Sequence, residues 1–121
     1  MSRALRYIGM SHQVSDDPAD ISKSDKLIFP GVGNFAEAVK RMRSSGIDDL
    51  LREMVLFRKV PILGVCLGMQ LFASFGDEGG GTQGLDLIKG KVVYHRASQK
   101  GLRLPHIGWN TSPSNTWWTT W

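Results

Sequence analysis

Cysteine is nearly absent from this sequence, since Cys66 is the only one among 121 residues. A lone cysteine cannot form an internal disulfide, so a small fold held together by disulfide bridges is excluded. In a reducing compartment such a cysteine is either inert packing or a reactive thiol. Its sequence context must decide between the two.

Long apolar runs are also missing. No segment reaches the roughly 18 continuous apolar residues of a membrane span, and residues 1–10 lack the apolar stretch of a secretory signal. The sequence therefore predicts no membrane segment and a cytoplasmic location. It also lacks a phosphate loop and a complete dinucleotide fingerprint, because the third glycine after Gly31-Val32-Gly33 is absent at the required spacing. Cys66 has no second metal ligand nearby, so we expect neither a metal nor a cofactor.

The basic residues do not form a cluster. The net charge is +4, but Lys and Arg are spread from Arg3 to Arg103, and only Lys40, Arg41 and Arg43 lie close together. Charge without a patch or motif is weak evidence for nucleic-acid binding, so we expect no nucleic-acid partner. A partner protein or an anionic substrate remains compatible with a basic face.

Short apolar runs alternate with amphipathic stretches in the first half of the chain. Residues 26–29 and 60–65 read as buried strands, and 34–45 reads as a helix capped by Asn34 and ended by Gly46. A second amphipathic stretch covers residues 47–55. This alternation predicts an α/β domain with a parallel sheet.

The second half of the chain is less regular. Residues 3–8 at the start are compatible with a helix stopped by Gly9, and residues 67–75 after Cys66 suit another helix. A glycine-rich loop is expected at 76–84, followed by short strands at 85–88, 91–94 and 107–109.

Cys66 lies in a pattern typical of a nucleophile elbow, Gly64-Val65-Cys66-Leu67-Gly68, between an expected strand and an expected helix. The small residues on either side allow a sharp turn with close backbone approach, and the dipole of the following helix would favour the thiolate. Attack on a carboxamide needs N–H donors for the oxyanion. The amide of Leu67 and the loop Pro30-Gly31-Val32-Gly33 are the visible sources.

Three motifs together resemble a known family: Pro30-Gly31-Val32-Gly33, Pro61-Ile62-Leu63-Gly64-Val65-Cys66-Leu67-Gly68-Met69-Gln70 and Pro105-His106-Ile107-Gly108-Trp109-Asn110. Over about residues 4–110 the chain is similar to the glutaminase subunits of imidazole glycerol phosphate synthases, which are class I glutamine amidotransferases. The resemblance implies a three-layer, mainly parallel, flavodoxin-like α/β fold, here incomplete. It further implies glutamine as substrate and ammonia transfer, from a glutamyl thioester, to a TIM-barrel cyclase subunit in a heterodimer.

The resemblance also assigns roles to individual residues. Cys66 would be the nucleophile, and the oxyanion would be bound by Val32, Gly33 and Leu67. The substrate-binding positions would be Gly31, Met69, Gln70 and Glu78, with Glu78 meeting the α-amino group of glutamine. Trp109 and Asn110 would lie at the cyclase interface. From the residues alone, Glu78 is a loop acid and Gln70 a polar helix residue.

The chain departs from the family in its triad. The histidine and glutamate of the family's His-Pro-Glu stretch are missing, and His12, His95 and His106 do not match that position. Little or no glutaminase activity is therefore expected from this chain alone. Because the family's first strand would lie upstream of Met1, and residues 111–121 form a divergent tail, we predict that residues 1–121 are one partial amidotransferase domain.

Three alternatives stand beside this interpretation. A similar subunit could supply ammonia for sugar amidation in surface polysaccharide synthesis. The chain could instead be a non-catalytic module that only docks on a barrel partner through Trp109. Cys66 could also be a redox or hydrolase cysteine of another α/β fold.

Overall fold

The computed structural model describes residues 1–94. The elements before the second strand are α1 (Ser2–Tyr7), α2 (Pro18–Ile21), β1 (Leu27–Gly31), α3 (Phe35–Ser45), α4 (Ile47–Arg52) and the π-helical turn η1 (Glu53–Phe57). Those that follow are β2 (Ile62–Cys66), α5 (Leu67–Gln70), β3 (Ala73–Gly76), the 3-10 turn η2 (Glu78–Gly80), β4 (Thr82–Gln83) and β5 (Ile88–Val92). Among residues 1–94, no helix combines the length and apolar character needed to cross a bilayer.

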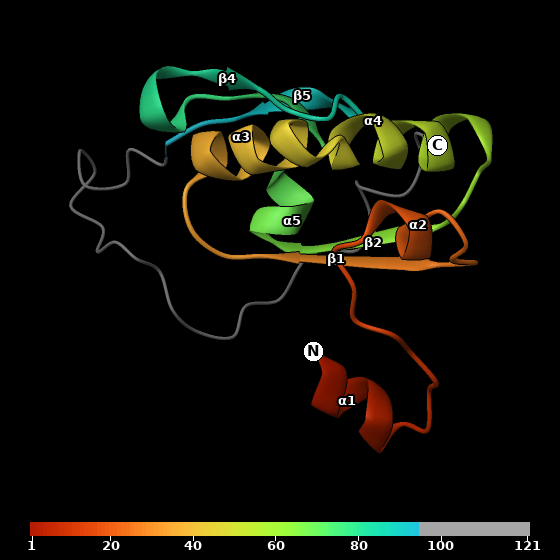
Figure 1. Ribbon diagram of the computed structural model, residues 1–121. Coiled ribbons are helices and arrows are strands. Elements are labelled where there is room, and N and C mark those ends of the chain that lie inside the picture. The colour runs from red at the N-terminus through yellow and green to blue at the C-terminus, as the bar shows by residue number, and fades with distance from the viewer. Residues whose placement is uncertain (95–121) are drawn as a thin grey trace, which may run out of the picture.

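The strands form two small sheets. β1 and β2 pair in parallel, and the second sheet has the order β4-β3-β5, with β3 parallel to β5 and antiparallel to β4. Helices α3 and α4 make the crossover from β1 to β2 and lie between the two sheets in Figure 1. The predicted combination of parallel strands and crossover helices is confirmed for this part of the chain.

The crossover helix begins and ends as its sequence predicts. The side chain of Asn34 accepts a hydrogen bond from the backbone N–H of Glu37 at 3.2 Å, which satisfies one of the unpaired donors of the first turn. Gly46 ends the helix with a φ of 69°, a conformation that glycine adopts without steric cost. Its buried side chains, Phe35, Val39 and Met42, all face the core.

The core lies between α3, α5 and the inner faces of the two sheets. Its buried members come from distant segments: Phe35, Val39, Met42, Leu51, Leu67, Leu71, Phe72 and Leu85. The ring of Phe29 on β1 stacks on Phe72, with ring centroids 6.4 Å apart. Strand β1 is thereby packed against the segment that follows α5.

The helix predicted over residues 67–75 is wrong in its second half. It ends at Gln70, and Ala73–Gly76 form β3 instead. The cause is tertiary, because this segment pairs with both β4 and β5, and the backbone carbonyl of Leu71 accepts from the N–H of Leu85 at 2.8 Å. Such pairing overrides a weak local helix preference.

The two strands predicted at 85–88 and 91–94 are also wrong, since one strand, β5, replaces them. Its register against β3 shifts between Ala73↔Ile88 and Phe75↔Lys91, so Lys89 and Gly90 together oppose Ser74. This two-against-one arrangement is a β-bulge. The pair Lys89-Gly90, which suggested a turn in the sequence, makes a bulge within one strand.

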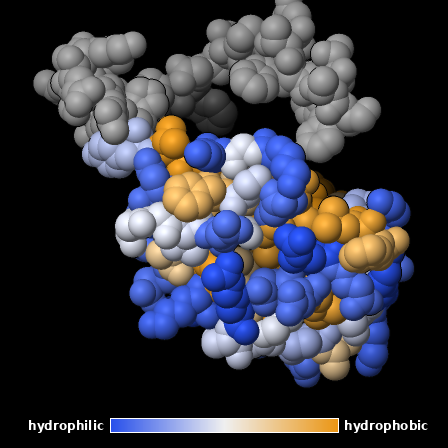
Figure 2. All heavy atoms as spheres, turned by 90° about the horizontal axis from the view of Figure 1, so that it is seen from above, coloured by the Kyte–Doolittle hydropathy of each residue, from blue (hydrophilic) through white to orange (hydrophobic). Residues whose placement is uncertain are grey.

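The first two strands were predicted to be buried, and this holds for one face only. Leu63 of β2 is 58% exposed, whereas Phe29 and Ile62 pack against the core. In the described range, helices cover only the inner face of this sheet, so the alternate side chains face solvent (Figure 1). The molecule seen from above is mainly hydrophilic, with smaller hydrophobic patches (Figure 2).

The predicted N-terminal helix is present as α1, and Gly9 follows it with a φ of 73°. It has no buried residue and stands apart from the rest of the described chain in Figure 1. It therefore contributes no side chain to the core.

Candidate active site

The register of the first sheet brings two sequence motifs together. Gly31, the last residue of β1, lies opposite Cys66, the last residue of β2. Since the strands are parallel, their carboxyl ends meet at one edge, where ligands bind in open α/β sheets. The Pro-Gly-Val-Gly loop and the cysteine motif thus share that edge, as the sequence predicts.

Cys66 has the backbone of a strained turn. Its φ of 56° and ψ of −123° lie outside the ordinary regions for a residue with a side chain, and it joins β2 directly to α5. The cysteine is exposed. A strand, a strained exposed cysteine and a helix follow one another, which is the order found in a nucleophile elbow.

Glycine is required on both sides of this cysteine. A Cβ on Gly64 would lie 2.5 Å from the Cα of Met69, and one on Gly68 would collide with the carbonyl group of Phe29. Contacts this short leave no room for a side chain. The predicted steric reason for small residues two positions before and after Cys66 is confirmed.

The helix that follows Cys66 is shorter than expected. Helix α5 has four residues, so few peptide dipoles are aligned behind the cysteine. The N–H of Leu67, its first residue, is still among the donors that have no partner within a helix.

The expected oxyanion loop lies next to the first turn of α5. A Cβ on Gly31 would come within 2.7 Å of the backbone nitrogen of Gly68. Gly33 has a φ of 103°, which a residue with a side chain rarely adopts, and Val32 between them is 92% exposed. Gly31 therefore contacts the elbow on the side of β1, and Val32 and Gly33 follow it along the chain.

The other proposed substrate residues are less closely grouped. Met69 and Gln70 lie on α5 just after the cysteine; Met69 is exposed and Gln70 half-buried. Glu78 lies in η2, where its carboxylate accepts a hydrogen bond from the backbone N–H of Phe35 at 2.7 Å. Nothing local in the sequence indicates this contact, because it joins residues 43 positions apart.

Among residues 1–94, no hydrogen bond joins Cys66 to a histidine or an acid that could act as its base. His12, the histidine within residues 1–94, contacts Ser2 Oγ at 2.7 Å and the Met10 carbonyl oxygen at 3.1 Å in the N-terminal segment. His95, His106, Trp109 and Asn110 lie outside the described residues. Residues 1–94 also contain no group of three or more side chains that could hold a metal ion.

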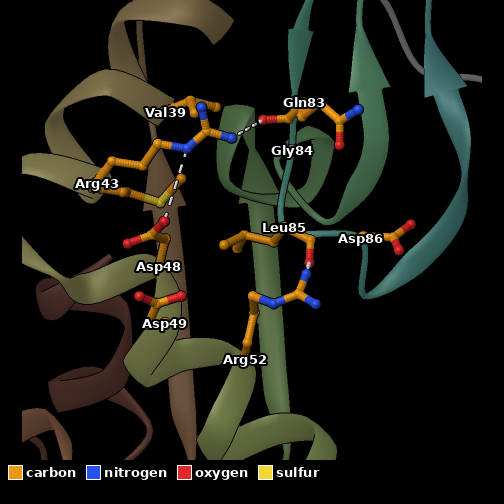
Figure 3. Close-up of a pocket in the computed structure, with 10 residues that line it drawn as sticks. Val39, Arg43, Asp48, Asp49, Arg52, Gln83, Gly84, Leu85 and Asp86 are labelled. Atoms are coloured by element: carbon orange, nitrogen blue, oxygen red, sulfur yellow. Dashed lines mark hydrogen bonds and ion pairs between the residues drawn. The ribbon is translucent and has the colours of Figure 1, made fainter.

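A separate hollow of about 340 Å³ lies between α3, α4 and residues 83–86, and Cys66 does not line it (Figure 3). Arg43 donates to the carbonyl oxygen of Gln83 at 3.1 Å and lies 3.8 Å from the Asp48 carboxylate. Arg52 donates to the carbonyl oxygen of Leu85. The two guanidinium groups therefore tie the crossover helices to β4 and to the segment that follows it.

Comparison with known proteins agrees with the site geometry. The family model described as glutamine amidotransferase class-I matches residues 2–115. The chain is 46% identical over 110 residues to "Imidazole glycerol phosphate synthase subunit HisH 1" of Campylobacter jejuni, covering 91% of this chain and 54% of that protein. It is 42% identical to the HisH subunit of Moorella thermoacetica, covering 91% of this chain and 50% of that protein.

The chain thus spans about half the length of the curated relatives it matches. The matched half includes the parallel strand pair, the strained cysteine and the glycine loop beside it. The match covers nearly the whole chain, and on this ground the chain belongs to the class I glutamine amidotransferase family.

Proposed function

We propose that this chain supplies the nucleophile and the oxyanion-binding part of a site that hydrolyses glutamine to glutamate and ammonia. The observation that carries the proposal is the pairing of Gly31 with Cys66, which puts an exposed, strained cysteine beside a glycine loop. In this proposal residues 1–121 are one partial amidotransferase domain.

The chemistry follows from that arrangement. The Cys66 sulfur, as thiolate, attacks the side-chain amide carbon of glutamine, and the carbonyl oxygen becomes negatively charged. Backbone N–H groups of Val32, Gly33 and Leu67 stabilise that charge. The C–N bond then breaks, ammonia leaves with an added proton, and water hydrolyses the glutamyl thioester to glutamate.

Substrate binding is assigned to residues around the same edge. Gly31 and Met69 would contact the glutamine side chain, Gln70 would hold its polar part, and Glu78 would lie near its α-amino group. Met69 is 56% exposed next to the cysteine turn, so its side chain is accessible to a bound ligand. No metal or cofactor takes part in this scheme.

The scheme still lacks a residue that carries out the proton transfers. His12 is held by Ser2 and Met10, and the chain contains no His-Pro-Glu stretch. Removing the base from a nucleophile-base pair typically lowers the rate by several orders of magnitude. We therefore expect negligible turnover by this chain alone.

The acceptor of the ammonia is proposed from the relatives. Their names place them in imidazole glycerol phosphate synthase. Together with the resemblance of the three motifs, this favours a cyclase barrel as heterodimer partner, histidine biosynthesis as pathway and the cytoplasm as location. Trp109 and Asn110 are proposed to lie at that interface. Sugar amidation remains the alternative fate of the ammonia, and docking without catalysis remains the alternative role.

The role of Cys66 as the nucleophile of a glutamine site can be tested without measuring turnover. The chain is treated with a diazoketone analogue of glutamine, and the modified residue is identified by mass spectrometry, with Cys66→Ala as the blank. We expect label on Cys66 that excess glutamine suppresses and excess asparagine does not. Labelling that glutamine leaves unchanged would contradict the proposed site, and ammonia release assays with and without a cyclase partner then measure turnover.

A further inference from the structure

We propose that Glu78 is a positioning residue, which holds the oxyanion loop in place by binding the backbone N–H of Phe35. Oxyanion loop here means residues 31–34. The inference rests on the proposed glutaminase function for its catalytic consequence only. Its structural part concerns one hydrogen bond of 2.7 Å from the Phe35 N–H to Glu78 Oε2.

Phe35 is the point at which the oxyanion loop ends. It is the first residue of α3, and its N–H belongs to the first turn, where intrahelical partners are missing. A carboxylate at this position satisfies the donor and interacts favourably with the positive end of the helix dipole. The sequence already supplies Asn34 for the N–H of Glu37, so Glu78 is a second cap on the same turn.

The side chain of Phe35 is held by the same segment that carries Glu78. Phe35 is fully buried, and a Cβ on Gly76 would lie 2.7 Å from its ring. A Cβ on Gly84 would lie 3.2 Å from the tip of the ring. Residues 76–84 therefore contact Phe35 through both its main chain and its side chain.

Both ends of the oxyanion loop are thereby fixed. Gly31 is held in the β1–β2 pair opposite Cys66, and Phe35 is held by Glu78 and the glycine contacts. Only Val32, Gly33 and Asn34 lie between these two points. Loss of the Glu78 bond removes the main-chain contact at one end of a segment whose amides must face the developing oxyanion, although the buried Phe35 ring remains in place.

The turn around Glu78 lies very close to the first turn of α3. Gly79 has a φ of 72°, and a Cβ on it would lie 3.1 Å from the Cβ of Ala36 in the first turn of α3. On the other side, both carboxylate oxygens of Asp77 accept from the N–H of Tyr94 at 3.0 Å. The turn is anchored at two places, so Glu78 is presented from a fixed support.

The substitution Glu78→Gln distinguishes a positioning role for Glu78 from a direct contact between its charge and the substrate. In Glu78→Gln a side-chain oxygen can still accept from Phe35, but the negative charge that would attract an ammonium group is gone. Glu78→Ala removes both. Glu37→Ala is the matched control, because Glu37 is an exposed acid in the same helical turn whose side chain bonds to no residue that the structure describes.

The first experiment measures backbone amide hydrogen exchange by NMR on the purified chain without glutamine. We expect Glu78→Ala to speed exchange at Phe35 by about tenfold or more, and to speed exchange at Gly33 as well. Glu78→Gln should remain within about threefold of the parent chain, and Glu37→Ala should match it. Unchanged exchange in Glu78→Ala, or equal acceleration in Glu78→Gln, overturns the proposal.

The second experiment uses the chain with its cyclase partner and compares kcat and KM for glutamine. A positioning role predicts that Glu78→Ala lowers kcat by about tenfold and that Glu78→Gln largely restores it. KM for glutamine should rise in both variants, because both lack the charge that would meet the substrate's α-amino group, so kcat is the readout of positioning. A kcat that is unchanged in Glu78→Ala, or lowered equally in both variants, overturns the proposal. If the parent assembly releases no ammonia, the labelling of Cys66 decides the proposed function, because this chain lacks the triad base, and the exchange result still decides the role of Glu78.

Discussion

A Cβ added to Gly68 would lie 1.9 Å from the carbonyl oxygen of Phe29, so the first turn of α5 rests directly on strand β1. This contact joins the cysteine motif to the strand that leads into the oxyanion loop. It explains why a glycine is needed two residues after Cys66.

Gly68→Ala should therefore strongly destabilise the chain. The new methyl group would meet backbone atoms, which cannot move aside as a flexible side chain would. We expect a loss of about 3 kcal/mol or more in the free energy of unfolding, measured by urea denaturation. Gly9→Ala is the control, because nothing lies within 4 Å of its Cβ and its positive φ costs at most about 1–2 kcal/mol. Equal losses in the two variants would contradict the close contact.

The strain at Cys66 predicts an unusual order of stability among variants. Cys66→Gly and Cys66→Ala both remove the thiol, but only glycine adopts a φ of 56° without steric cost. The glycine variant should be more stable than the alanine variant by about 0.5–1 kcal/mol, since relief of strain exceeds the added entropy of the unfolded chain. The urea midpoints of the two variants measure this, and an alanine variant of higher stability would argue against a strained turn.

Among the aromatic residues of the described range, Phe35 is predicted to be the one whose replacement by alanine destabilises the fold most. It is fully buried among residues from α3, α5 and the 76–85 segment, so Phe35→Ala should cost about 3–5 kcal/mol. Phe57, which is 79% exposed, is the matched control and should cost less than about 1 kcal/mol. Far-UV circular dichroism during urea titration compares them, and similar midpoints for both would place Phe35 outside the core.

The interactions of Asp86 predict that the stability of the fold depends on pH in the acid range. Hydrogen bonds from the Lys89 ammonium at 2.5 Å, and next from Ser74 Oγ at 2.5 Å, lower the pKa of the Asp86 carboxyl below its ordinary value. A carboxyl with a lowered folded-state pKa stabilises the fold above its unfolded pKa, and this stabilisation is lost as the pH falls through the folded pKa. The stability difference between the parent chain and Asp86→Asn should thus be constant near neutral pH and shrink below about pH 4.

Asparagine suits this comparison because it tolerates the positive φ of 54° at position 86. Urea midpoints at neutral pH and near pH 3 measure the two differences. Lys89→Met, which removes the larger cause of the shift, should reduce the acid-dependent part. A difference between parent and Asp86→Asn that does not change with pH would contradict the assignment.

Several features were determined by the sequence alone, because their causes are local or depend on motif order. Asn34 and Gly46 set the bounds of α3 through side-chain capping and a left-handed turn. Gly64 and Gly68 around Cys66 indicated the elbow, since only glycine fits that turn. The order and spacing of three motifs, at residues 30–33, 61–70 and 105–110, indicated the family, whose model matches residues 2–115.

Other features were decided only by the tertiary structure. Residues 73–76 form a strand because residues 82–83 and 88–92 pair with them. This pairing overrides the weak local preference of the segment for helix. The bulge at Lys89-Gly90 depends on the register against Ser74. The bond from Phe35 to Glu78 likewise depends on two segments 43 residues apart meeting at the start of α3, and periodicity along the chain carries no information about such a meeting.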